Sequence, residues 1–299
     1  MRIIVTGATG FVGRCFVDMY SNKYNFILLV RKTSKIEPKL LKLKNFRIIR
    51  TDIDSIESIK RLAEELNEKI DCILHLAADT KINNLCLHTN IQTTRNTVYL
   101  AKLLNIPKII FMSTDNVYCS YDNFYGKSKI NAEKFVRTIY AHTIFRCTVI
   151  FGKNNERFLE KINSMINTLP ILIIPGSGKY LLQPIFVKDV CKYLEKAIQN
   201  NIIGTFDLAG NKAISMNAFL KICIILKNQK KSIIHIWLAP VLLFLNVLNL
   251  IKLIDETIIV QLKNMNKSRV YNIEKLNTVF KIKQTKLEKA LEFSITNKK

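Results

Sequence analysis

The chain has 299 residues, a hydrophobic fraction of 48% and a mean hydropathy of +0.11. These values exclude a disordered polymer and predict a compact globular protein. The formal net charge is +23 and the pI about 9.7, but the lysines are dispersed among isoleucine and asparagine and form no dense basic stripe. We therefore expect no nucleic-acid partner, and we interpret the positive field as favouring a small anionic substrate.

The cysteine pattern bears on the compartment. The seven cysteines lie far apart, without a CxxC pair or the spacing of zinc ligands, and several fall inside apolar runs. We therefore expect free, mostly buried thiols and no metal site. No signal peptide precedes the first expected strand, which predicts a reducing, cytoplasmic location.

Over the first 150 residues, short apolar segments alternate with longer helical patterns. The expected strands, rich in Ile, Val and Phe, are Arg2–Thr6, Phe26–Val30, Arg47–Arg50, Cys72–Leu76, Lys108–Met112 and Thr143–Val149. The expected helices cover about 11–21, 55–69, 85–105 and 126–140. This alternation predicts an α/β fold with a doubly wound parallel sheet, the Rossmann arrangement, whose ligand lies at the carboxyl ends of the strands.

After Gly152 the pattern loosens. We expect residues 1–152 to form a dinucleotide-binding domain and 153–299 a smaller, mostly helical substrate lobe interwoven with the sheet. The expected elements are a helix at Glu156–Thr168, a strand between Pro170 and Pro175, a helix with Asp189 as its N-cap and a further sheet strand at Thr205–Ala209.

One C-terminal segment, residues 233–251, is largely apolar and follows three lysines. It approaches the length of a membrane span but contains His235, Pro240, Asn246 and Asn249. We favour a buried or lid-like helix, with peripheral membrane contact as the less favoured alternative.

The turn after the first strand carries three glycines, Gly7, Gly10 and Gly13, and opens a helix. The first glycine allows a tight turn, the second a close approach of pyrophosphate and the third close helix–strand packing, while the helix N-terminus attracts anions. This pattern predicts a dinucleotide site that also includes the neighbouring residues Thr9, Phe11 and Val12.

The end of the second expected strand indicates which dinucleotide is bound. Arg31 and Lys32 stand there without a carboxylate, which suits a ribose 2′-phosphate and favours NADP(H) over NAD(H). The alternative is that both side chains simply face solvent.

Tyr125 and Lys129 lie four residues apart and share one helix face. A neighbouring ammonium favours phenolate and lowers a tyrosine pKa toward useful acid–base range. Thr114 closes the fifth strand, where its hydroxyl would hold a reacting oxygen.

These motifs, together with others in the same order along the chain, make the sequence resemble the extended short-chain dehydrogenase/reductase family, and within it the NAD-dependent epimerases and dehydratases. Many members of this family modify nucleotide sugars. The matching stretches are Thr6–Gly13, Asp52-Ile53, His75–Ala78, Asn90 with Thr94, Ser113–Tyr118, Tyr125–Lys129 with Glu133, Arg146 with Phe151-Gly152, and Pro184–Val190.

The resemblance implies a catalytic triad of Thr114, Tyr125 and Lys129, with Lys129 also holding the nicotinamide ribose. It further implies a structural role for His75. The remaining cofactor-binding positions that it implies are Asp52 and Ile53 at the adenine, and Leu76, Ala77, Ala78 and Asn90 along the cofactor. The helices at 85–105 and 126–140 resemble the family's dimer-forming pair, which implies a homodimer, although their apolar faces are equally consistent with a core.

Three departures narrow the chemistry. Asn116 stands where similar 4,6-dehydratases carry a glutamate that removes a sugar proton, so dehydration is disfavoured. The loop at 115–124 is short for this family, and Cys147 replaces a common proline.

We therefore expect an NAD(P)-dependent reductase of a keto group on a nucleotide-linked deoxysugar. One alternative is a nucleotide-sugar epimerase using bound NAD. The other is a non-catalytic dinucleotide-binding assembly or regulatory protein.

Overall fold

The computed structural model describes residues 1–36, 38, 45–80, 84–119, 123–153, 155, 158–254 and 256–296. Its main element is a seven-stranded sheet in which all neighbouring strands are parallel. In spatial order the strands are β11 (Gly204–Leu208), β6 (Ala141–Cys147), β5 (Lys108–Thr114), β4 (Cys72–His75), β1 (Arg2–Thr6), β2 (Asn25–Val30) and β3 (Phe46–Arg50). The chain order reverses between β1 and β4, which confirms the predicted doubly wound α/β sheet.

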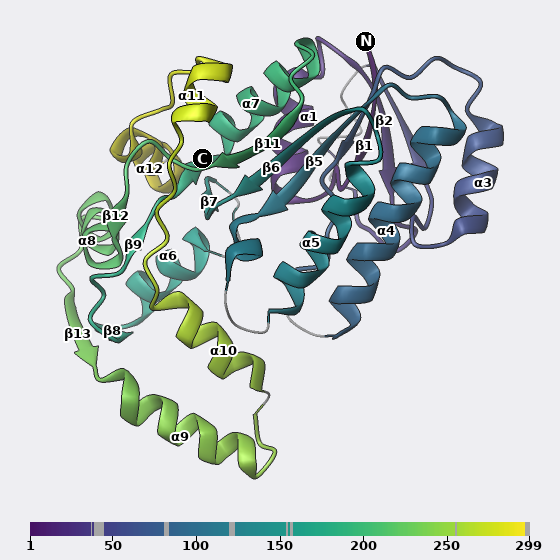
Figure 1. The fold of residues 1–299 in the computed structure, drawn as a ribbon. Coiled ribbons are helices and arrows are strands. Elements are labelled where there is room, and N and C mark those ends of the chain that lie inside the picture. The colour runs from purple at the N-terminus through teal and green to yellow at the C-terminus, as the bar shows by residue number, and fades with distance from the viewer. Residues whose placement is uncertain are drawn as a thin grey trace.

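Helices cover both faces of this sheet (Figure 1). One layer consists of α1 (Phe11–Tyr20) and α7 (Val187–Gln199), and the other of α3 (Ile56–Glu65), α4 (Asn84–Leu103) and α5 (Phe124–Val136). Along β1, Ile3 and Val5 enter the core beneath α1 and α7, whereas Ile4 enters the core on the opposite face. The strands are continuously apolar because both faces of the sheet are buried.

Several boundaries differ from those expected. The fifth strand continues to Thr114, and the sixth ends at Cys147, two residues before its expected end. Within the helix expected at Glu156–Thr168, α6 occupies Leu159–Thr168, while residues 156 and 157 lie outside the described residues. All seven cysteines are free, and five of them are buried, as expected.

The second half of the chain forms three small two-stranded sheets, several helices and a third apolar core. The pairs are β7 (Ile150–Phe151) with β10 (Ile185–Phe186), β9 (Leu181–Leu182) with β12 (Ile214–Ser215), and β8 (Ile171–Pro175) with β13 (Ser232–Ile236). The helices in this half, besides α6 and α7, are α8 (Met216–Leu226), α9 (Leu238–Leu250), α10 (Glu256–Met265), α11 (Glu274–Phe280) and α12 (Leu287–Thr296). Strand β11 belongs to the large sheet and α7 packs against that sheet, although both come from the second half of the chain. The chain therefore crosses between the large sheet and the smaller sheets more than once.

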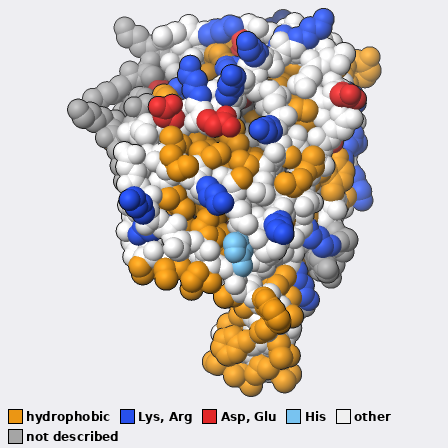
Figure 2. Space-filling view, turned by 90° about the vertical axis from the view of Figure 1, so that its left-hand side faces the viewer, with side chains coloured by type: hydrophobic (Ala, Val, Ile, Leu, Met, Phe, Trp, Pro, Cys, Tyr) orange, Lys and Arg blue, Asp and Glu red, His pale blue; other side chains and the backbone are white. Residues whose placement is uncertain are grey.

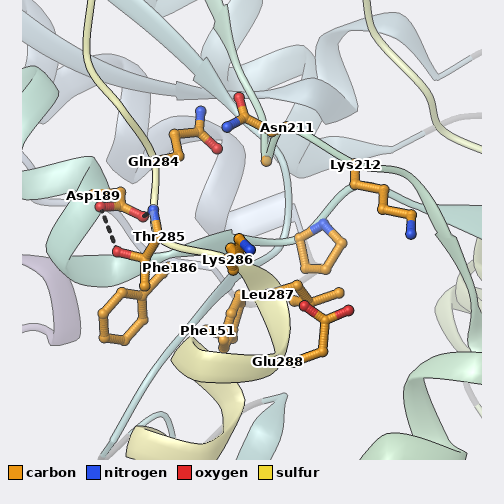
Figure 3. A pocket seen from close by; sticks show the side chains of 12 residues that line it. Phe151, Phe186, Asp189, Asn211, Lys212, Gln284, Thr285, Lys286, Leu287 and Glu288 are labelled. Carbon is orange, nitrogen blue, oxygen red and sulfur yellow. Dashed lines mark hydrogen bonds between the residues drawn. The ribbon is translucent and has the colours of Figure 1, made fainter.

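Asp189 fastens the C-terminal segment to α7. The expectation that it caps this helix was wrong, because α7 begins at Val187 and Asp189 lies within the first turn. Its buried carboxylate accepts hydrogen bonds from the backbone N–H and the hydroxyl of Thr285, at 2.8 and 3.1 Å. A cavity of about 260 Å³ lies beside this contact (Figure 3), and none of the predicted site residues lines it.

The apolar segment at 233–251 is neither a single helix nor buried, so the expectation of a buried helix was wrong. Its first residues belong to β13, and the rest form α9, in which no side chain is buried. Helices α9 and α10 extend from the body of the molecule as a projection (Figure 1), which we call the apolar arm. Apolar composition predicted burial, but β13 pairs with β8 at the edge of the lobe and directs the following residues outward. Within the described ranges, no helix is both long and apolar enough to cross a membrane.

Candidate active site

The glycine turn lies between the carboxyl ends of β1 and β4. Gly7 has a φ of +74°, and a Cβ there would lie 2.6 Å from the backbone nitrogen of Ala77. A Cβ on Gly13 would lie 2.2 Å from the carbonyl oxygen of Gly7. The turn closes through a 3.0 Å hydrogen bond from the Gly10 N–H to the same oxygen. Only glycine therefore fits at Gly7 and Gly13, because any side chain would push the turn away from β4 and α1.

The first turn of α1 follows directly and faces the same edge of the sheet. Gly10 occupies its N-cap position and provides no side chain to cap the helix. The neighbouring residues Thr9, Phe11 and Val12 are partly exposed. Backbone N–H groups at an open helix N-terminus form an anion site, so the cradle fits the pyrophosphate of a dinucleotide.

A chain of hydrogen bonds joins β1, β4 and α4 beneath the turn. The N–H of Ala77 donates to the Thr6 hydroxyl, which lies 2.7 Å from His75 Nδ1. The other ring nitrogen of His75 lies 3.0 Å from Thr94 Oγ1, which donates in turn to the Asn90 carbonyl. Burial lowers the pKa of His75 to about 3, so the ring stays neutral and links its partners. This geometry matches the structural role expected for His75.

Asn90 holds the loop that follows β4. Its Oδ1 accepts from the Asp79 N–H at 2.7 Å, and its Nδ2 donates to the Asp79 carbonyl at the same distance. Nδ2 also lies 3.0 Å from the Ser128 hydroxyl on α5. Both ends of the amide are thus engaged within the protein. Asn90 therefore positions the partly exposed residues Leu76, Ala77 and Ala78.

The residues expected at the adenosine end gather after β2 and β3. Arg31 is exposed, and the ammonium of Lys32 lies 4.0 Å from the Asp52 carboxylate. Ile53 is buried, and its carbonyl accepts a 2.8 Å hydrogen bond from Asn96 on α4. The structure therefore brings these four predicted residues to one corner of the sheet, where Arg31 and Lys32 are both exposed.

Tyr125 and Lys129 lie in α5, beside the end of β5. The Lys129 ammonium is 5.9 Å from the centre of the Tyr125 ring and 4.5 Å from that of Phe111. It donates a 2.9 Å hydrogen bond to the carbonyl of Met112. Lys129 is almost wholly buried, and this burial lowers its pKa to about 8. A cation is thereby held under a partly exposed phenol.

The start of α5 packs against a short 3₁₀ turn, η1 (Asp115–Tyr118), that follows Thr114. Asn123 caps α5 by accepting from the N–H groups of Tyr125 and Gly126, at 3.0 and 3.2 Å. A Cβ on Gly126 would lie 2.4 Å from the carbonyl oxygen of Asn116, so glycine permits this close contact. Tyr125 is therefore held against the end of β5.

The partly buried side chain of Asn116 links this turn to its neighbours through hydrogen bonds. Its Nδ2 donates to Thr114 Oγ1 at 3.0 Å, and its Oδ1 accepts from Asn123 at 3.2 Å and from Arg269 at 3.1 Å. The Thr114 oxygen also accepts from the Asn116 N–H, at 3.2 Å. The Thr114 O–H in turn donates a 3.3 Å hydrogen bond to Asp115 Oδ1.

An ion pair between the partly exposed Arg146 and the buried Glu133 braces α5 against β6. Arg146 binds both carboxylate oxygens of Glu133, at 3.0 and 2.7 Å, and also donates to the hydroxyl of Tyr118 at 2.7 Å. The Ser113 hydroxyl donates to the same carboxylate at 2.7 Å. Burial opposes ionisation of Glu133, but these hydrogen bonds hold its pKa below the ordinary value. The brace sets the distance between α5 and the end of β5.

Two residues near the site, Arg269 and Tyr271, were absent from the sequence prediction. Arg269 lies 3.3 Å from the buried carboxylate of Asp115, and the Tyr271 hydroxyl donates to the same oxygen at 3.3 Å. A cavity of about 260 Å³ lies between Tyr118 and the stretch that holds Lys267 and Arg269. One signal was available: beyond residue 157, a region rich in lysine, Arg269 is the chain's only arginine.

Comparison with known proteins identifies a family and several relatives. The model of the NAD dependent epimerase/dehydratase family matches residues 3–207. Human dTDP-D-glucose 4,6-dehydratase is 26% identical over 226 residues, which cover 63% of this chain and 63% of that protein. An Escherichia coli O157:H7 protein, N-acetyl-alpha-D-glucosaminyl-diphospho-ditrans,octacis-undecaprenol 4-epimerase, is 25% identical over 226 residues, covering 68% and 65%. The chain thus spans just under two thirds of the length of these relatives.

Solved structures match nearly the whole fold. UDP-N-acetylglucosamine 4-epimerase from Methanobrevibacter ruminantium M1 has a TM-score of 0.77 at 18% identity, covering 99% of this chain and 97% of that one. The NAD complex of dTDP-glucose 4,6-dehydratase from Bacillus anthracis str. Ames has a TM-score of 0.78 at 18% identity, covering 99% and 96%. At this identity the likeness establishes the fold.

Proposed function

The chain belongs to the NAD dependent epimerase/dehydratase family, and we propose that it is a nucleotide-sugar epimerase, which inverts one sugar carbon by oxidising its hydroxyl to a transient ketone and reducing that ketone again, without dehydration. The observation that carries this proposal is the Tyr125–Lys129 pair on α5, with a buried ammonium 5.9 Å from the phenol ring. The relatives and structural neighbours include both 4-epimerases and 4,6-dehydratases. Asn116 supports the first of these reactions.

The cofactor residues form the base of the proposed site. The cradle at Gly7, Gly10 and Gly13 fits a pyrophosphate, because side chains at the first and last of these positions would clash with backbone. When bound, the nicotinamide accepts or supplies the hydride at the sugar carbon. Ala77 and Ala78 then line the cofactor, while Lys129 orients the ribose.

Proton transfer falls to Tyr125. A buried ammonium favours the phenolate of a neighbouring tyrosine, so Lys129 makes the phenol a usable acid and base. Tyr125 takes the proton from the sugar hydroxyl during oxidation and returns a proton to the ketone oxygen during reduction. On substrate binding, the Thr114 O–H turns from Asp115 Oδ1 to the same sugar oxygen and holds it in place.

Asn116 argues against dehydration. An amide does not remove a carbon-bound proton, and both ends of this one are engaged by Thr114, Asn123 and Arg269. In similar dehydratases a glutamate occupies this position. Oxidation and reduction at one carbon therefore remain as the chemistry that these residues support.

The cavity beside Tyr118 supports an anionic substrate. Lys267 and Arg269 contribute to its lining, and their charges suit the diphosphate of a nucleotide sugar. We also retain the homodimer as a proposal, supported by the pairing of α4 with α5 on one outer layer (Figure 1).

Arg31 supports a second candidate, an NADPH-dependent reductase of a keto group on a nucleotide-linked deoxysugar. Arg31 is exposed at the end of β2, where a guanidinium binds a 2′-phosphate. This preference for NADP(H) over NAD(H) predicts tighter NADPH than NADH binding. A purified protein that carries bound NAD favours the epimerase instead.

The test is incubation with UDP-N-acetylglucosamine, UDP-glucose or dTDP-glucose in the presence of NAD, with products separated by chromatography. The lipid-linked sugar named in the Escherichia coli relative is added as a further substrate. We expect an epimer of one of these sugars. If only 4-keto-6-deoxy nucleotide sugars react, and only with NADPH, the chain is the reductase.

Tyr125→Phe is the matched variant, and Tyr140→Phe is its control because Tyr140 is 87% exposed and lies outside α5. Removing a general acid–base group lowers turnover by roughly 10²- to 10⁴-fold. Unchanged turnover in Tyr125→Phe would contradict the role given to Tyr125. Full biological function of this variant in the cell would favour a non-catalytic dinucleotide-binding protein.

A further inference from the structure

The apolar arm exposes hydrophobic side chains along one face of α9, and the side chains of the opposite face are only partly buried. Leu243 is 68% exposed, Phe244 63% and Leu250 82%. The helix has thirteen residues, and its only polar side chains are Asn246 and Asn249. A helix that is apolar all round is ordinarily buried, and large exposed apolar surfaces mark contact sites. Figure 2 shows this surface as the almost wholly hydrophobic tip of the projection.

Between Asp207 and Asp255 the charged side chains have one sign, and Glu256 begins α10. From residue 208 to residue 254 the chain contains no aspartate or glutamate but six lysines: Lys212, Lys221, Lys227, Lys230, Lys231 and Lys252. Lys230 precedes β13, Lys252 follows α9, and both are exposed. The apolar helix is thus flanked at both ends by cations. This combination complements a surface that is apolar beneath a layer of negative charge.

Trp237 marks the boundary between these two kinds of surface. It is the only tryptophan in the chain, it stands at the N-cap of α9, and it is 84% exposed. Tryptophan is a costly residue to leave in water, and it is favoured at the interface between lipid headgroups and acyl chains.

The length of α9 decides how such a surface is engaged. Thirteen helical residues extend about 20 Å, whereas the hydrocarbon core of a bilayer is about 30 Å thick. The helix is therefore too short to cross and long enough to lie within one leaflet. We propose that the apolar arm docks the protein onto an anionic membrane surface, with α9 in the interface and Trp237 at the headgroup level.

The arm is connected to the candidate site along the chain. Helix α10 packs beside α9 and ends at Met265, and the residues that follow, including Lys267 and Arg269, line the cavity beside Tyr118. A docked arm therefore keeps this cavity close to the lipid surface. The inference concerns binding alone and does not depend on the proposed reaction.

Because Trp237 is the only tryptophan, its fluorescence reports on the arm directly. The full chain is titrated with vesicles of phosphatidylcholine alone and with vesicles that also contain phosphatidylglycerol. We expect a blue shift of the emission and co-sedimentation with the anionic vesicles, and weakening of both as salt is raised. Unchanged emission and no co-sedimentation with anionic vesicles would overturn the proposal.

Two variants separate the apolar and electrostatic contributions. Leu243→Gln/Phe244→Gln keeps Trp237 and should weaken vesicle binding by about tenfold or more. Lys230→Gln/Lys252→Gln should remove most of the preference for anionic over neutral vesicles, by roughly tenfold. Ile203→Gln/Val279→Gln is the control, because both side chains are exposed and lie outside the arm. Equal binding by the Leu243/Phe244 variant and this control would contradict the proposal.

A second copy of the chain is the competing occupant of the arm. Sedimentation velocity without lipid tests it with the same variants. Self-association that is lost in Leu243→Gln/Phe244→Gln, together with no vesicle binding by the parent chain, would assign the arm to a protein–protein contact and overturn membrane docking.

Discussion

Helices α5 and α9 have the same length, thirteen residues, and opposite relations between composition and burial. Helix α5 carries three lysines, a glutamate and an asparagine, yet it lies against the sheet with Lys129 and Glu133 buried. Helix α9 is almost entirely apolar, yet none of its side chains is buried. If side-chain hydrophobicity alone decided burial, α9 would be buried and α5 would be exposed.

The difference lies in the partners that each helix finds. Glu133 is buried with Arg146 and Ser113 on its carboxylate, and Lys129 is buried with the Met112 carbonyl on its ammonium. Buried charges are tolerated where such partners exist, and in α5 they serve the candidate site. No part of the chain that the structure describes covers α9 closely enough to bury any of its side chains. Polar burial and apolar exposure thus both point to function.

The largest effect should come from Lys129→Met, which keeps the side-chain volume and removes the buried charge. Turnover should fall by roughly 10²- to 10⁴-fold because the neighbouring phenol loses its cation. Stability at neutral pH should be unchanged or higher by about 1 kcal/mol, since desolvation of the ammonium is removed.

The pH dependence of the free energy of unfolding, measured by chemical denaturation, gives a second readout for Lys129→Met. The folded pKa of Lys129, about 8, lies below its ordinary value of 10.5, so the unfolded state binds more protons between these values. The parent protein should therefore gain stability as pH rises through this range, and Lys129→Met should lack that gain. Identical pH profiles would contradict the assignment of a buried, charged lysine.

The next effect should come from Glu133→Ala, which leaves Arg146 without its carboxylate. Breaking a buried pair on one side should lower the free energy of unfolding by about 3 kcal/mol. Glu64→Ala, at an exposed position on α3, is the control and should change it by less than about 0.5 kcal/mol.

The stability difference between the parent protein and Glu133→Ala should depend on pH. Because the folded pKa of Glu133 lies below its ordinary value, its contribution is present above pH 4.5 and is lost as pH falls through the folded pKa. Urea denaturation at several pH values should show the two proteins converging in acid. A constant difference across the range would mean that the charge of Glu133 is not what stabilises α5.

The smallest effect on stability should come from the arm. Leu243→Gln/Phe244→Gln should change the free energy of unfolding by less than about 0.5 kcal/mol, because α9 buries neither side chain. Val136→Gln, at a wholly buried position of α5, should cost about 3 kcal/mol in the same assay. Marked destabilisation by the arm variant would show that α9 packs against the body of the protein in solution.

Local motifs account for what was predictable. The strand, glycine turn and helix at residues 2–20 were expected almost to the residue, because φ values and close packing restrict such a turn to glycine. The same holds for the parallel sheet, since apolar strands between helices have few alternatives. The match to the family confirms the expectation drawn from these motifs.

Contacts between distant segments account for what was missed. Arg269 reaches Asp115 across more than 150 positions of sequence, and Asp189 binds Thr285 across 96. The side chain of Asn116 was recognised only as a missing carboxylate, whereas in the fold it links Thr114, Asn123 and Arg269. Such pairings depend on how β5, α5 and the C-terminal segment meet.

By itself, the sequence determined the order of strands and helices, the glycine cradle and the four-residue spacing of Tyr125 and Lys129, because backbone sterics and helix periodicity act over a few residues. Tertiary structure alone decided that Lys129 and Glu133 lie inside while α9 lies outside. Burial depends on which surfaces other parts of the chain supply, and in this protein they supply partners for the charges of α5 and leave the apolar arm exposed.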